Sequence, residues 1–182
     1  MLVRAGITGK DRALITGASG GVGTVAVQLT RLRGADVIAV SSRSKMEQVL
    51  DSGANRTLAR EDDLVAVLGE NSISAVVDLV GGTSWPQLLD LLQPGGRYVT
   101  AGAIGGPIVE LDLRTLYLKD ISLYGCVYQE PEVFQNIINY LEAGRLRPKI
   151  AATYQLQDIV EAQKKFLEKD FVGKISLVLP QD

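Results

Sequence analysis

The sequence contains no histidine and only one cysteine, Cys126. The absence of histidine excludes the commonest general base, every Ser–His or Cys–His nucleophile pair and histidine-rich metal sites. A single cysteine excludes an internal disulfide, so we expect a reducing, cytoplasmic environment. Because only carboxylates remain as ordinary metal ligands, we expect no metal site and identify no catalytic residue. Chemistry must therefore come from a cofactor or from residues outside this chain.

Long apolar runs and a strong net charge are also lacking. The apolar runs are short and interrupted by glycine, so none is predicted to span a bilayer. Residues 1–6 do not have the layout of a signal peptide. The 19 lysines and arginines nearly balance the 21 acidic residues, which does not favour a nucleic-acid surface or a membrane-binding stripe. We therefore expect neither nucleic acid nor membrane as a partner.

Short apolar runs alternate with segments of helical period along most of the chain. Six strands are predicted, at residues 13–16, 37–40, 55–59, 75–80, 97–100 and 121–124. Helical segments are predicted between them and after them, at residues 22–34, 45–50, 64–68, 85–92 and 131–144. The strands are almost wholly apolar, as parallel strands covered on both faces are. The pattern predicts an α/β fold with a doubly wound parallel sheet. The order 3-2-1-4-5-6 is expected from the dinucleotide-binding motif described below.

Two of the predicted helices have a clear apolar face. In the first helix, five side chains are expected to point inward: Val22, Val25, Ala26, Leu29 and Leu32. In the last helix of the series the inward set is Val133, Phe134, Ile137, Ile138 and Leu141. Pro131 suits the first turn of that helix, and Gly144 suits its end.

A shorter module follows, with a strand at residues 150–154, a helix at 158–167 and a strand at 174–179. The alternation of strands and helices changes near Leu146-Arg147-Pro148. We therefore divide the chain into a domain of residues 1–147 and a short C-terminal βαβ-like extension of residues 148–182.

One glycine-rich motif joins the first strand to the first helix. It has the form A-x-G-x-x-G and comprises Ala18, Ser19, Gly20, Gly21, Val22 and Gly23. Gly20 would let the backbone approach a diphosphate, and Gly23 would let the helix pack closely on the sheet. The amide groups at the start of the helix would face the phosphates. A purely structural turn is the alternative, but a strand before the motif and a helix after it favour a dinucleotide-binding Rossmann domain.

Taken with other segments, this motif resembles the medium-chain dehydrogenase/reductase superfamily, in particular its zinc-independent quinone oxidoreductase-like branch. The similar segments are residues 14–23 with 26–29, 77–81, 92–97, 144–148, and 161–163 with 173–175. The resemblance implies NADPH-dependent hydride transfer to a quinone or an α,β-unsaturated carbonyl. Members of this superfamily are usually about twice as long and begin with a catalytic domain. We therefore expect this chain to be the cofactor-binding half of a parent enzyme and to be inactive alone.

The residues after the second strand favour NADPH over NADH. NAD-binding versions place an acid at this point, where it accepts from the ribose 2′-hydroxyl. Here the strand leads into Ser41, Ser42, Arg43, Ser44 and Lys45. A guanidinium and an ammonium suit a 2′-phosphate. Solvated charges at a helix start are the alternative, but cations oppose the dipole there.

Loops after the fourth and fifth strands complete the predicted site, because ligands of such sheets lie at the carboxyl ends of the strands. The predicted cofactor-binding residues here are Val80, Gly81, Gly82, Ala101 and Gly102. The resemblance puts them near the nicotinamide, whereas ordinary loop glycines are the alternative. Asp78 lies inside an apolar strand and is expected to be a hydrogen-bonded structural carboxylate rather than a catalytic one.

The sixth strand is expected at an open edge of the sheet, where its apolar residues would pair with a second copy in a homodimer. A C-terminal extension folded over this edge is the alternative. Two other functions also stay open at this stage: a stand-alone nucleotide-binding or regulatory module without enzymatic activity, and the enoyl-reductase part of a larger synthase.

Overall fold

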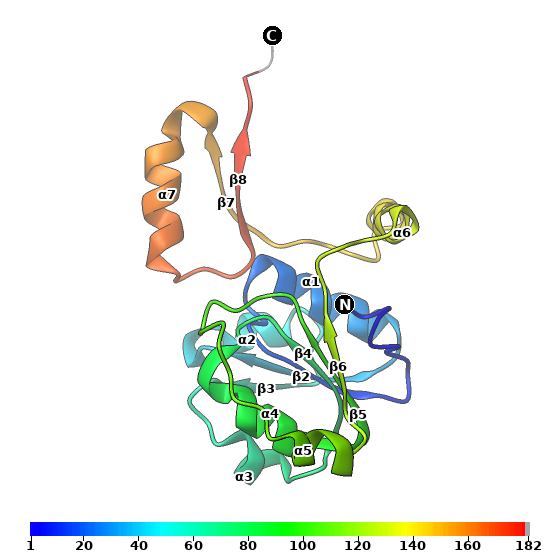
Figure 1. Cartoon of the computed structure of the whole chain (residues 1–182). Coiled ribbons are helices and arrows are strands. Elements are labelled where there is room, and N and C mark those ends of the chain that lie inside the picture. Colours follow the sequence, from blue (N-terminus) through cyan, green and yellow to red (C-terminus); the bar gives the residue numbers. More distant parts are fainter. Residues whose placement is uncertain (181–182) are drawn as a thin grey trace.

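The computed structural model describes residues 1–180 as an α/β fold with two parts (Figure 1). The larger part holds a six-stranded parallel sheet in the order β3-β2-β1-β4-β5-β6, as predicted. The strands of this sheet are β1 Arg12–Ile15, β2 Asp36–Ser41, β3 Arg56–Ala59, β4 Ile73–Asp78, β5 Leu92–Thr100 and β6 Ser122–Gly125. The helices are α1 Gly21–Leu32, α2 Met46–Leu50, α3 Leu64–Leu68, α4 Trp85–Leu91, α5 Leu113–Leu118 and α6 Pro131–Glu142. Short 3-10 turns lie at η1 Arg43–Lys45 and η2 Gly82–Ser84.

Helices cover both faces of the sheet because neighbouring residues of its buried strands point to opposite sides. In β1, Ile15 belongs to the core on the side of α1 and α2, whereas Leu14 belongs to the core on the side of α3 and α4. Residues 2–7 add to the first of these cores, and Ile121 adds to the second. The apolar character of the strands thus follows from burial on both sides.

The predicted inward face of α1 is correct at Ala26, which is buried, and wrong at the other four residues. Its buried residues are Gly23, Thr24, Ala26, Val27 and Thr30. Val22 is half exposed, and Val25, Leu29 and Leu32 are only partly buried. The phase of the helix is set at Gly23, where an added Cβ would collide with the backbone of Gly17 and Ala18. Small residues therefore lie where α1 comes closest to the turn, whereas Val27 is in the core and Leu29 packs against it from a partly buried position.

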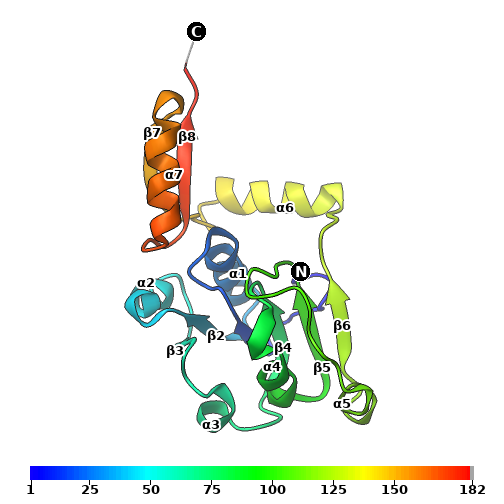
Figure 2. The ribbon, with the colours of Figure 1, turned by 60° about the vertical axis from the view of Figure 1, so that its left-hand side comes forward.

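The predicted inward face of α6 is also not buried. No residue of this helix is buried, and Phe134 is 63% exposed. Figure 2 shows why: α6 lies beyond the end of β6 instead of against a face of the sheet. The helix α5 was not predicted, and none of its residues is buried.

The second part is the C-terminal module, residues 150–178, which forms the βαβ unit that the sequence predicts. Its elements are β7 Ile150–Gln155, η3 Leu156–Asp158, α7 Ile159–Glu168 and β8 Lys174–Val178. The strands β7 and β8 pair in parallel as a separate sheet. The module projects from the end of the large sheet at which β1 leads into α1 (Figures 1 and 2). The domain boundary at residue 147 stays a prediction.

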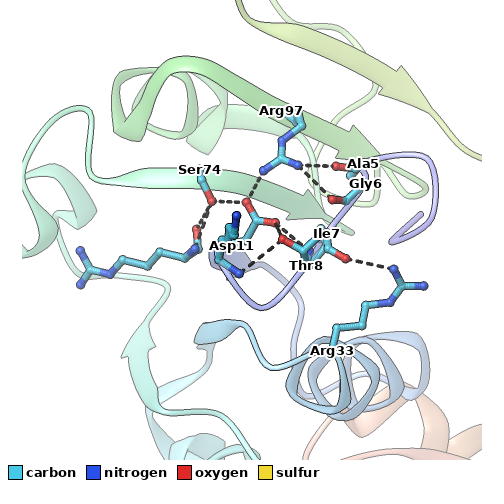
Figure 3. A network of polar contacts seen from close by, with 10 residues as sticks. Ala5, Gly6, Ile7, Thr8, Asp11, Arg33, Ser74 and Arg97 are labelled. Carbon is cyan, nitrogen blue, oxygen red and sulfur yellow. Dashed lines mark hydrogen bonds and ion pairs between the residues drawn. The ribbon is translucent and has the colours of Figure 1, made fainter.

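A buried polar network fastens residues 5–11 to the end of the sheet at which β1 begins, away from the C-terminal module (Figure 3). Asp11 accepts from the Thr8 N–H at 2.8 Å, from the Ser74 hydroxyl at 2.7 Å and from the Arg97 guanidinium. Arg97 also donates to the carbonyls of Ala5 and Gly6. Burial disfavours the charged form of Asp11, but these hydrogen bonds outweigh it and lower the pKa of the carboxyl.

Candidate nucleotide-binding site

The glycine-rich turn ends at the N-terminus of α1, which has no capping side chain. The Gly20 N–H donates to the Gly17 carbonyl at 3.0 Å, and Gly17 has a φ of +60°, so the turn doubles back tightly. Gly20 is the N-cap residue of α1, so no side chain accepts from the first amide groups of the helix. The first turn of α1 contains no acidic residue. The first amide groups of α1 therefore have neither a capping side chain nor a nearby negative charge.

The predicted 2′-phosphate residues follow β2, and here the structure adds an acid that the sequence did not predict. Ser41 is buried, and its hydroxyl donates to the Ser42 carbonyl at 3.2 Å. Arg43 donates through Nη2 to Asp62 Oδ1 at 2.8 Å. Asp62 comes from the loop after β3 and also accepts from the Ala59 N–H at 2.9 Å. The Asp62 carboxylate thus pairs with Arg43, the cation that we expect to bind the 2′-phosphate.

Lys45, the second predicted cation, contacts the C-terminal module. Its ammonium donates to the carbonyl of Lys169, the residue that ends α7 in a left-handed conformation. Burial lowers the pKa of Lys45; Arg60 and Lys169 lower it further, and Asp170 opposes them. Both cations therefore already have intramolecular partners, although Arg43 keeps a side chain that is 70% exposed.

Asp78 organises the loop after β4, as the sequence analysis expected. Its side chain is fully buried and accepts from the hydroxyls of Thr16 and Tyr98. It also accepts from the backbone N–H groups of Val80 at 2.9 Å and Gly81 at 3.1 Å. Burial, and then the Asp78 carboxylate, raise the pKa of Tyr98 far above its usual range. The prediction of a hydrogen-bonded structural carboxylate is confirmed.

The two predicted loops pack backbone against backbone. Gly82 has a φ of +75°, and an added Cβ would collide with Gly105. A Cβ on Gly102 would collide with the carbonyl of Leu79. The Gly105 N–H donates to the Val80 carbonyl at 2.7 Å. Glycines are therefore required here by close packing, and contact of Val80, Gly81, Gly82, Ala101 and Gly102 with a nucleotide stays a prediction.

All three groups of predicted residues lie at the same end of the sheet, because they follow the carboxyl ends of β1, β2, β4 and β5. The C-terminal module contacts this same end of the sheet. The Gly173 N–H donates to the Ser19 carbonyl at 2.9 Å, and Gly173 forms a parallel bridge with Gly20. Sequence reasoning missed this contact, since no periodic pattern links residues so far apart in the chain.

Comparison with known proteins decides the family. The family model for zinc-binding dehydrogenases matches residues 21–143. The chain belongs to this family. The match confirms the resemblance to medium-chain dehydrogenases and reductases, and it runs from the start of α1 past the end of α6, so that it covers strands β2 to β6.

Three relatives illustrate how similar this chain is to known members of the family. A protein from Sinorhizobium meliloti 1021, assigned as an alcohol dehydrogenase, has a solved structure that is 43% identical, with a TM-score of 0.93 over 99% of this chain and 51% of that chain. The acryloyl-coenzyme A reductase of Sulfurisphaera tokodaii is 30% identical over 96% of this chain and 52% of its own length. The Bacillus subtilis protein YhfP, assigned as a quinone oxidoreductase, is 28% identical in a structure with NAD bound, with a TM-score of 0.80 over 96% of this chain and 56% of that chain. The chain spans about half the length of the curated relatives it matches.

The family is named for zinc binding, but the residues of this chain do not provide a zinc site. Structural zinc sites use cysteine and histidine ligands, and this chain has one cysteine and no histidine. Among residues 1–180, no group of three histidine, cysteine, aspartate or glutamate side chains is placed to hold a metal ion. In the same range, no helix has the length and apolar character needed to cross a membrane.

Proposed function

We propose that this chain binds NADPH and forms the cofactor-binding half of an oxidoreductase that reduces a small electron-poor acceptor. The observation that carries the proposal is the glycine turn with the uncapped start of α1, in a member of a dehydrogenase family. NAD in the structure of YhfP supports a nicotinamide dinucleotide as the ligand class.

A bound nicotinamide nucleotide would supply the hydride, and the residues of this chain would bind and orient it. The amides at the start of α1 would hold the diphosphate, and Arg43 and Lys45 would hold the 2′-phosphate. The loops fastened by Asp78 would border the nicotinamide. The Asp78 carboxylate has four donors, two of them in the loop after β4, and such a fixed loop suits a site that must hold a reactive ring in one position.

For the acceptor we propose a quinone or an α,β-unsaturated carbonyl compound. The named substrates of two relatives support this class, since acryloyl-coenzyme A is an α,β-unsaturated thioester and YhfP is assigned to quinones. Both acceptors take a hydride at an electron-poor carbon or oxygen. The proposal also includes a cytoplasmic location, because Cys126 is a free thiol, which fits a reducing compartment.

Calorimetric titration of the chain with NADPH and NADH tests the choice of nucleotide. We expect NADPH to bind more tightly, and Arg43→Ala to weaken NADPH about tenfold while NADH stays unchanged, because a guanidinium–phosphate contact is charge-assisted. Arg114→Ala is the matched control, since Arg114 also pairs with an aspartate at 2.8 Å on an exposed surface. Equal affinities of the wild-type chain for both nucleotides would overturn the assignment of NADPH.

A further inference from the structure

Thr16 connects two segments of the candidate site that are far apart in the sequence. It is the first residue after β1 and precedes Gly17, where the glycine-rich turn doubles back. The parallel register of β1 and β4 pairs Ile15 with Val77. Thr16 and Asp78, each one residue further along, are therefore neighbours. Because Thr16 is only 4% exposed, its hydroxyl must find its partners within the protein.

The Thr16 hydroxyl forms hydrogen bonds as a donor and as an acceptor. It donates to Asp78 Oδ1, and it accepts from the Leu79 N–H at 3.0 Å. Asp78 in turn accepts from the N–H groups of Val80 and Gly81. Three consecutive amide groups of the loop after β4 are thus bound to Thr16, either directly or through one carboxylate.

The glycine-rich turn and the loop after β4 are also in direct contact. A Cβ added to Gly17 would lie 3.1 Å from Val80 Cγ2 and 3.3 Å from Leu79 Cβ. On its other side, Leu79 meets the loop after β5, since a Cβ added to Gly102 would lie 2.6 Å from the Leu79 carbonyl oxygen. A shift of the Leu79 backbone would therefore move both loops that we assign to the nicotinamide.

We propose that Thr16 is a positioning residue, which fixes the loop after β4 relative to the glycine-rich turn and thereby holds the nicotinamide half of the nucleotide in place beside the diphosphate half. This inference rests on the proposed function. Thr16 is buried, so it acts through Asp78 and Leu79 and not by contact with the nucleotide. The alternative is that its hydroxyl only stabilises the fold.

Two substitutions and three ligands separate these roles. Thr16→Val removes the hydroxyl and keeps nearly the same shape, whereas Thr16→Ser keeps the hydroxyl. NADPH, NADH and ADP-ribose are titrated by calorimetry, because ADP-ribose contains the diphosphate but lacks the nicotinamide. Thr30→Val is the matched control, since Thr30 is buried in α1 and its hydroxyl has no hydrogen-bond partner among residues 1–180.

We expect Thr16→Val to weaken NADPH and NADH about fivefold, which corresponds to the loss of one buried hydrogen bond. ADP-ribose should lose less than about twofold, because the glycine-rich turn keeps its own hydrogen bond between Gly20 and Gly17. Thr16→Ser should restore the affinities for NADPH and NADH, and Thr30→Val should change none of the three. Thermal unfolding without ligand shows whether each variant is folded.

Three results would overturn the inference. The first is unchanged affinity for NADH in folded Thr16→Val. The second is a loss of ADP-ribose binding as large as that of NADH, which would place the effect outside the nicotinamide loops. The third is a loss in Thr16→Ser as large as that in Thr16→Val, because the hydroxyl would then not be its cause.

Thr16→Cys decides the question if Thr16→Val does not fold, since a thiol of similar size forms only weak hydrogen bonds. It should weaken NADH more than ADP-ribose, and equal affinity changes for the two ligands would contradict the inference. Absence of binding of NADPH and NADH to the wild-type chain would instead refute the proposed function, so the two failures are distinguishable.

Discussion

Asp62 brings a carboxylate to the position where the sequence after β2 has none. Its Oδ1 pairs with Arg43 and its Oδ2 accepts from Ala59, so the side chain is held from two sides. A 2′-phosphate that binds Arg43 would have to displace this carboxylate and would be repelled by it. Arg43 is largely exposed, so solvent screens the competition and keeps it small.

Asp62→Asn should therefore tighten NADPH binding about threefold and leave NADH unchanged, because it removes a competing and repelling charge but keeps an acceptor for Ala59. Titrations at low and high salt check the cause, since added salt should diminish the gain. Asp112→Asn is the control, as Asp112 also caps a backbone N–H and pairs with an arginine. Weaker NADPH binding in Asp62→Asn would mean that the carboxylate positions Arg43 for the phosphate.

Single residues were predictable where the signal is local. The hydrogen-bonded state of Asp78 follows from a charge inside an apolar strand, which cannot be buried without partners. The contacts of Asp62 and Lys174 did not follow, because each joins segments that are distant in the sequence. Only the register of β3 beside β2 brings Asp62 to Arg43, and only the docking of β8 brings Lys174 to Gly21.

At the level of elements, the strands were predictable because buried parallel strands are continuous apolar runs, and their order followed from the dinucleotide-binding motif after the first strand. Helix faces were less predictable. In α1 the close approach at Gly23 determines which residues are buried, so that Val27 lies in the core and Val22 is half exposed. In α6 the amphipathic pattern was correct as a pattern, but the chain places the helix beyond β6, where no face of the sheet covers it.

The N-terminal segment of residues 1–11 depends on the network of Asp11. We expect Asp11→Asn to destabilise the chain at pH 7 by about 2 kcal/mol, since it removes the charge that accepts from Arg97 in a buried setting. The folded-state pKa of Asp11 is lowered, so its stabilisation is present in full above the unfolded pKa, near 3.8, and is lost as the pH falls through the lower folded value.

Urea unfolding of the wild type and Asp11→Asn at several pH values measures this effect. The difference between the two should be constant near neutral pH and shrink below about pH 4. Asp36→Asn is the control, because its ion pair with Arg12 lies on the surface and should contribute little. A difference that grows on acidification would contradict the assigned role of the carboxylate.

Across the whole molecule, β6 is an edge strand, as predicted: it pairs with β5 on one side. Within residues 1–180, no strand pairs with its other side, and the C-terminal module lies elsewhere. Apolar residues are exposed in the segment after this strand, with Val127 95% and Tyr128 66% exposed, and in α6, where Phe134 is largely exposed. The homodimer through this edge remains our proposal, since paired edges satisfy bare backbone groups and cover apolar surface.

Light scattering at micromolar concentration should give the mass of a dimer. Val127→Lys should weaken the dimer at least about tenfold, because it puts a charge into the contact. The substitution is preferable to one at Leu123, whose side chain packs against the core and would confound stability with association. A monomer mass for the wild type, unchanged by Val127→Lys, would rule out this interface.

Gly173 precedes β8 and connects it to the glycine-rich turn. Its φ of +97° and its contact with the backbone of Lys149 leave no room for a side chain, and its N–H is bonded to Ser19. In terms of sequence drift, any substitution here disturbs a backbone turn, the β7–β8 pair and the glycine-rich turn at once. Selection on the glycine-rich turn therefore extends to a residue of the C-terminal module, and these two segments cannot diverge independently.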